Sequence, residues 1–150
     1  MLKISAEKGF KTELQAPTAV LVTRRVTFAA AHVLRRPEWD DRRNKEVFGQ
    51  CAGDHGHNYV LEVSVSGEPD PATGMVVNLK DLDRAVKQAV VRHVDHRHLN
   101  RDVPFLEGVV PTAENLALVF WRQLDGQMGS GQLQRLRLVE SENNSVEVTR

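Results

Sequence analysis

The chain has 150 residues, 41% of them hydrophobic, which suits one domain with a single buried core. Its 20 Lys and Arg residues balance 20 Asp and Glu residues, so the formal net charge is zero and the composition excludes a general electrostatic affinity for nucleic acid or an acidic membrane surface. One cysteine excludes an intramolecular disulfide, and the sequence has neither a leader-type segment nor an apolar run of about 18 residues. We therefore expect a cytoplasmic protein that binds neither nucleic acid nor membrane.

The first predicted element is a β-rich strand over residues 19–32 that ends at His32. Residues 1–18 lack clear periodicity, and we interpret them as an N-terminal extension or an additional strand before a single domain over 19–150. Residues 33–54 are charged and contain Pro37, Gly49 and Gly53, which predicts a long loop with a helical turn over 41–48. Loops of this length in compact domains are usually functional or disordered.

The next predicted strand begins with the sequence His-Gly-His. Apolar residues alternate with polar ones after it, and His55 and His57 share the parity of Tyr59 and Leu61, so both imidazoles should project from one face. If this strand pairs antiparallel with the first, the end of one meets the start of the other. His32 would then lie beside both histidines.

The remaining elements complete an α+β pattern. Residues 68–74 predict a turn, and residues 75–78 predict a short partner strand. Asn78 predicts the cap of a helix. The apolar stripe of this helix is Leu79, Leu82, Val86, Ala89, Val90 and Val94. Thr112 predicts the cap of a second helix that buries Leu116, Val119, Phe120 and Leu124. Strands follow, with Glu140 on the face of Leu136 and Leu138. This order predicts two β-hairpins, each associated with a helix, in an antiparallel sheet with the helices on one face.

The three histidines predict a zinc site. Imidazole nitrogens suit Zn²⁺, and three protein ligands leave a fourth position open, as in catalytic sites. The alternative is a polar strand edge without metal. Cys51 precedes His55 by four residues and is either a fourth ligand of a closed structural site or a reactive thiolate beside an open one.

Three acidic residues and a histidine have two interpretations each. Asp95 could hold His96 for acid and base chemistry, but adjacent side chains often point apart, and a polar surface segment is the alternative. Glu140 and Glu114 could bind a ligand, or could be solvated or capping residues. The inward parity of Glu140 favours a functional role for it.

Several motifs in order resemble one family from Val22 to Val148. They are FAAAH at 28–32, FGQC at 48–51, HGHNY at 55–59, GEPDPATGMVVNLKDL at 67–82, VDHRHLN at 94–100, PTAEN at 111–115 and VESENN at 139–144. Together they resemble the 6-pyruvoyltetrahydropterin synthase and 6-carboxytetrahydropterin synthase family.

The resemblance implies the T-fold, a four-stranded antiparallel sheet with two helices on one face, whose sheets join into a barrel. It implies a homohexamer of two stacked trimers with active sites at subunit interfaces. The family's zinc ligands fall on His32, His55 and His57, its catalytic residues on Cys51, Asp95 and His96, and its pterin-binding residues on Glu140, Thr112 and Glu114. The implied substrate is 7,8-dihydroneopterin triphosphate.

The motifs divide between two subfamilies. The spacing C-x-x-x-H-G-H resembles 6-carboxytetrahydropterin synthases of the queuosine route, whereas FGQC, HGHNY and DPATGMVVNL resemble the pyruvoyl branch. Because the spacing fixes where the thiolate lies, we expect a carbon-carbon lyase that forms 6-carboxy-5,6,7,8-tetrahydropterin, acetaldehyde and triphosphate. The alternatives are a 6-pyruvoyltetrahydropterin synthase, a T-fold aldolase or hydrolase acting on another pterin or purine, and a non-catalytic structural zinc module.

Overall fold

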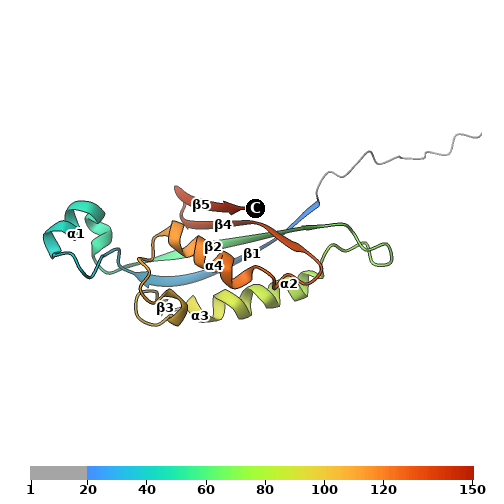
Figure 1. Cartoon of the computed structure of the whole chain (residues 1–150), viewed down its shortest axis with the longest axis horizontal. Helices are drawn as coiled ribbons and strands as arrows, with labels where there is room; N and C mark the ends of the chain where they lie inside the picture. Colours follow the sequence, from blue (N-terminus) through green and yellow to red (C-terminus); the bar gives the residue numbers. More distant parts are fainter. Residues whose placement is uncertain (1–19) are drawn as a thin grey trace, which may run out of the picture.

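A five-stranded sheet forms the centre of the molecule, and the computed structural model describes residues 20–150 (Figure 1). The strands are β1 (Val20–His32), β2 (His55–Gly67), β3 (Arg97–His98), β4 (Gln132–Ser141) and β5 (Asn144–Thr149), in the spatial order β3-β1-β2-β4-β5. The helices are α1 (Asp41–Phe48), α2 (Leu79–Val86), α3 (Arg92–Val94) and α4 (Ala113–Leu124), with helical turns η1 (Gly49–Ala52), η2 (Lys87–Val91) and η3 (Pro104–Leu106). The expected extension over residues 1–18 lies outside the described residues.

The α+β class and the pairing of the two longest strands are confirmed. Strands β1 and β2 are antiparallel along their whole length, from Val20 opposite Gly67 to His32 opposite His55. Strands β2 and β4 are also antiparallel, as are β4 and β5. The register of the β1–β2 pair is what brings the three histidines to one end of the sheet.

Two details of the predicted sheet are wrong. The sheet is mixed and has five strands rather than four antiparallel ones, because the two-residue strand β3 adds to one edge and runs parallel to β1 at Ala30 and Ala31. Residues 75–78 form no strand: β2 already has β1 on one side and β4 on the other, which leaves no edge for them. Among them only Val76 is fully buried, packing close to Gly67.

Helix α2 continues through the π-helical turn η2 into α3. The buried stripe is Leu82, Val86, Val90 and Val94, a spacing of four residues that would drift by about 40° per step around a regular α-helix. The wider π turn counteracts this drift and keeps the stripe on the sheet. Leu79 is 52% exposed, so its predicted place in the stripe is wrong.

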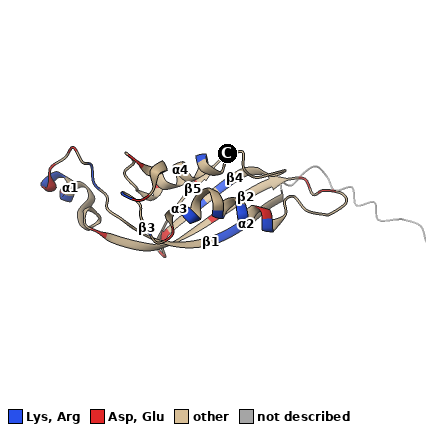
Figure 2. Ribbon diagram, turned by 90° about the horizontal axis from the view of Figure 1, so that it is seen from below, with Lys and Arg blue, Asp and Glu red and all other residues tan. Residues whose placement is uncertain are grey.

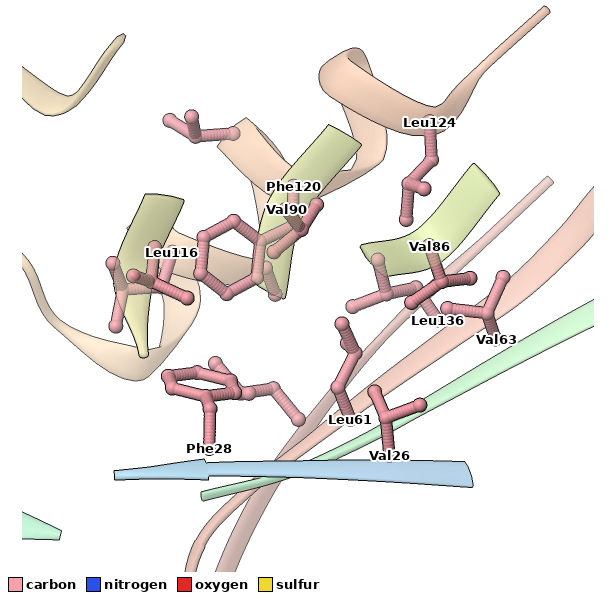
Figure 3. Close-up of a cluster of buried hydrophobic side chains, with 14 of the residues drawn as sticks. Val26, Phe28, Leu61, Val63, Val86, Val90, Leu116, Phe120, Leu124 and Leu136 are labelled. Carbon is pink, nitrogen blue, oxygen red and sulfur yellow. The ribbon is translucent and has the colours of Figure 1, made fainter. Parts of the chain in front are cut away.

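The core lies between one face of the sheet and the two long helical segments, as expected. Figure 3 shows Phe28, Leu61 and Leu136 from the strands facing Val90 and Phe120 from the helices. Thr112 accepts a hydrogen bond from the backbone N–H of Asn115 and so caps α4, as predicted. The four apolar residues that this helix was predicted to bury are buried: Leu116, Val119, Phe120 and Leu124.

The long loop between β1 and β2 contains the predicted helical turn as α1, which projects from one end of the sheet (Figure 1). Asn44 is fully buried and anchors the loop, since its side-chain amide donates to the carbonyls of Arg36, Trp39 and Asp40. Trp39 stacks on Phe48 and lies beneath the guanidinium of Arg43. Charged residues of both signs are interspersed along the molecule (Figure 2). None of the helices in residues 20–150 is long and apolar enough to cross a membrane.

Candidate metal centre

His32, His55 and His57 converge at the end of the β1–β2 ladder. His32 is the last residue of β1 and lies opposite His55, the first of β2, while the period of two residues along β2 puts His57 on the same face. One nitrogen from each imidazole lies within 4.8 Å of the others. The cluster is on the helix-covered face of the sheet, where His32 is fully buried.

The hydrogen bonds of two of these rings leave their Nε2 atoms available as ligands. The Nδ1 of His32 donates to the carbonyl of Pro111 at 2.9 Å, and the Nδ1 of His55 donates to the carbonyl of Gly53 at 2.8 Å. The Nε2 atoms of all three histidines are buried and have no hydrogen-bond partner within residues 20–150. Buried polar atoms without partners are costly, and Nδ1–H donation to a carbonyl is the arrangement that orients metal-binding histidines. The cluster could therefore hold a metal ion.

The protonation states of His32 and His57 favour the binding of a cation. Burial lowers the pKa of His32 to about 4, and the neighbouring imidazoles add to this effect. Burial also lowers the pKa of His57, against the opposing effect of Glu140. At neutral pH both rings are neutral, which is the form that binds metals.

Glu140 connects the cluster to an adjoining pocket. Its Oε1 lies 4.0 Å from the Nε2 of His57, and its side chain also lines a pocket of about 490 Å³ together with Thr112 and Glu114. The three predicted pterin-binding residues thus lie around one cavity beside the histidines. A carboxylate in this position can accept two parallel hydrogen bonds from a planar ligand with adjacent N–H groups.

Asp95 and His96 point toward one another, contrary to the expectation for adjacent side chains. His96 has a φ of 57°, and this left-handed conformation brings its Nδ1 to 2.9 Å from Asp95 Oδ1. The same carboxylate accepts from the backbone N–H of Ala29, and His96 N–H donates to the Ala29 carbonyl. The pair is therefore fixed to the edge of β1, with the His96 ring 83% exposed beside an open depression of about 510 Å³.

Cys51 lies apart from the histidines. It is exposed on η1, and its carbonyl accepts from Leu34 N–H at 2.8 Å, which ties the two ends of the loop together. Within residues 20–150 the group of potential ligand atoms contains the three histidines and not the Cys51 thiol. The sequence left open whether Cys51 is a fourth ligand. In the structure the cluster consists of three ligand atoms, one from each histidine.

Other groups at the site were missed in the sequence. The carbonyls of Gly53 and Pro111 orient the imidazoles but carry no side-chain signal. The hydroxyl of the fully buried Tyr59 lies 3.4 Å from His32 Nδ1, and burial raises its pKa. Tyr59 follows His57 by two residues, so the alternation of side chains along the strand was the signal that could have placed it beside the histidines.

Comparisons with known proteins show the family to which the chain belongs. The model of the family "6-pyruvoyl tetrahydropterin synthase" matches residues 21–150. The 6-pyruvoyl tetrahydrobiopterin synthase of Homo sapiens is 42% identical over 127 residues, which cover 83% of this chain and 88% of that protein. A putative 6-carboxy-5,6,7,8-tetrahydropterin synthase of Archaeoglobus fulgidus is 34% identical over 101 residues, covering 67% of this chain and 80% of that protein.

Solved structures show the same fold. The structure of Caenorhabditis elegans 6-pyruvoyl tetrahydropterin synthase superposes with a TM-score of 0.82 at 36% identity, covering 88% of this chain and 96% of that one. An uncharacterized protein of Wolinella succinogenes has a TM-score of 0.68 at 16% identity, covering 89% and 99% of the two chains, and shows the fold alone. The chain belongs to the 6-pyruvoyl tetrahydropterin synthase family.

Proposed function

We propose that the protein is a metal-dependent lyase that removes triphosphate from 7,8-dihydroneopterin triphosphate. The observation that carries this proposal is the convergence of three buried Nε2 atoms, without a hydrogen-bond partner in the described part of the chain, beside a carboxylate that lines a pocket. The family membership supplies the substrate class.

We assign the metal as Zn²⁺, held by His32, His55 and His57. Three neutral imidazoles are a usual donor set for catalytic zinc, with one position left for substrate. When bound, the ion would act as a Lewis acid that stabilises negative charge developing on the oxygens of the substrate side chain. The Pro111 and Gly53 carbonyls hold two of the rings so that their Nε2 lone pairs face inward.

Glu140 would anchor the pterin ring. Its carboxylate accepts two hydrogen bonds from the guanidine-like edge of the pterin, while Thr112 and Glu114 line the same pocket. The 4.0 Å between Glu140 and His57 then sets the ring next to the metal ligands. This orientation would place the substrate side chain over the three histidines.

Cys51 and His96 would move the protons. The Cys51 thiolate takes a proton from the substrate side chain, and protonated His96, held by Asp95, returns one. Both side chains are exposed in the single chain. Their exposure is consistent with a site that is completed by a second copy of the chain.

We further propose that the copies assemble as a hexamer of two trimers. Within the described residues, the side of β1 that faces away from β2 is paired only at Ala30 and Ala31, by β3. The other edge of the sheet is β5, which pairs on one side with β4. Joining such edges between copies would satisfy their backbone groups.

The product expected from the C-x-x-x-H-G-H spacing was 6-carboxytetrahydropterin, but the comparisons favour the alternative. The relative that is 42% identical and the solved structure that is 36% identical both bear the 6-pyruvoyl name, whereas the relative named for the 6-carboxy product is 34% identical. We therefore propose 6-pyruvoyltetrahydropterin as the product, formed by loss of triphosphate and an internal redox shift that needs no external oxidant. The second candidate, supported by the cysteine spacing, consumes water and releases acetaldehyde in addition.

Product analysis tests the proposal. The zinc-loaded protein is incubated anaerobically with 7,8-dihydroneopterin triphosphate, the pterin is identified by mass spectrometry, and acetaldehyde is trapped. We expect 6-pyruvoyltetrahydropterin without acetaldehyde. 6-Carboxytetrahydropterin with one equivalent of acetaldehyde would establish the second candidate. No turnover, together with zinc bound through the Cys51 thiolate, would instead indicate a structural zinc module.

A further inference from the structure

Asp54 and His98 meet across the end of β1. Asp54 directly precedes β2, and His98 is the second residue of β3, and these two strands flank β1 on either side. The Nε2 of His98 lies 2.9 Å from Oδ1 of Asp54. The contact passes over the point where β1 ends at His32.

The backbone fixes the direction of this hydrogen bond. The Nδ1 of His98 accepts from the backbone N–H of Asn100 at 3.3 Å, and the Asp54 carboxylate is an acceptor, so the Nε2 of His98 donates to Asp54. The backbone N–H of His98 donates to Asp102, and the side chain is only 14% exposed. The guanidinium of Arg101 lies 3.3 Å both from the same Asp54 oxygen and from His98 Nε2, both longer than the 2.9 Å contact between Asp54 and His98.

Each end of the contact lies next to a part of the candidate site. On one side Asp54 separates His55 from Gly53, whose carbonyl orients the His55 ring. On the other side His98 follows His96 by two residues. The left-handed backbone of His96 persists only where surrounding contacts hold it, and those contacts are its hydrogen bonds to Ala29 and the pairing of β3.

We propose that Asp54 and His98 are positioning residues, whose hydrogen bond, the Asp54–His98 bridge, fixes the Asp95–His96 pair relative to the three-histidine cluster. The inference rests on the proposed role of His96 as proton donor. Neither Asp54 nor His98 touches the substrate in this account. Both act by holding two segments that approach β1 from opposite sides.

Two substitutions of His98 form a matched pair. His98→Asn keeps an acceptor at the place of Nδ1 for Asn100 but has no donor that reaches Asp54. His98→Gln carries its amide N–H about as far out as Nε2, so it can restore the donor. Comparison of the two variants separates the hydrogen bond from the mere shape of the ring.

The first readout is amide hydrogen exchange, which needs no turnover. We expect the amides of His96 and Leu99, which bond to β1, and the segment 53–57 to exchange about two- to fivefold faster in His98→Asn, the modest effect of an interaction with a largely exposed carboxylate. His98→Gln should resemble the unsubstituted protein. Equal exchange in all three proteins, or equal acceleration in both variants, would overturn the bridge.

The second readout is turnover of 7,8-dihydroneopterin triphosphate. We expect His98→Asn to lower kcat by about threefold or more at unchanged KM and zinc content, and His98→Gln to recover it. Faster exchange with unchanged kcat would show a bridge that is structural only and would overturn the positioning role. A protein that exchanges as expected but has no activity even without substitution would contradict the proposed function, not the bridge.

Discussion

Acidification should destabilise the metal-free protein through His32. Its ring is fully buried, and burial lowers its pKa from 6.5 to about 4, while in the unfolded chain it titrates near the ordinary value. Above pH 6.5 both states are neutral at this residue, and below it the unfolded chain binds a proton that the folded protein takes up only near pH 4. The free energy of unfolding therefore falls as the pH drops through this window.

The size of the effect follows from proton linkage. Each pH unit changes the free energy of unfolding by about 1.4 kcal/mol per proton, so the interval from 6.5 to about 4 amounts to about 3 kcal/mol from His32 alone. Urea unfolding in a chelator, at one protein concentration and a series of pH values, measures it. The control is His32→Asn, which keeps an N–H donor for the Pro111 carbonyl but does not titrate.

His32→Asn should flatten the dependence of unfolding free energy on pH by about one proton between pH 6.5 and 4. His57, whose pKa is also lowered, would contribute the slope that remains. If the variant and the unsubstituted protein lose stability in parallel over this window, His32 is not buried as a neutral ring. The account of the cluster would then be refuted.

Substitutions at three further residues separate the proposed roles. Cys51→Ala should retain zinc, measured by metal analysis, and lose about 100-fold or more in kcat as a general base would, whereas loss of zinc would make the thiol a ligand. Glu140→Gln should raise KM for the pterin substrate about tenfold or more because a charge-assisted hydrogen bond is lost, and an unchanged KM would place the ring elsewhere. Thr112→Ala should lower the free energy of unfolding by about 1 kcal/mol in urea, and Thr112→Ser should not, because Thr112 caps α4; equal losses would argue against the cap.

The three-histidine cluster could be predicted because it depends on two local regularities. The alternation of side chains along a strand puts His55 and His57 on one face, and an antiparallel pair brings the end of β1 to the start of β2. Both follow from the order of residues alone. The alternation along β4 likewise predicted that Glu140 continues the face of Leu138, which brings it to His57.

The parts that could not be predicted depend on tertiary contacts. The strand β3 has only two residues, too few for a periodic pattern. It forms because hydrogen bonds of Asp95, His96 and Leu99 to β1 hold it in place. The apolar residues at 75–78 have the composition of a strand, but both sides of β2 are occupied. The π turn was implicit in the four-residue spacing of the stripe but was not inferred from it.

Triphosphate release as a function of bound zinc shows whether the reaction depends on an ion held by the three histidines. The metal-free protein is titrated with Zn²⁺ in the presence of 7,8-dihydroneopterin triphosphate, and free triphosphate is followed by phosphorus NMR. We predict no release without metal and a rate that rises linearly to one equivalent of zinc per chain, with no rise in a His55→Ala variant. Equal release from the metal-free protein would contradict the account, since the three histidines would then hold no ion that the reaction requires.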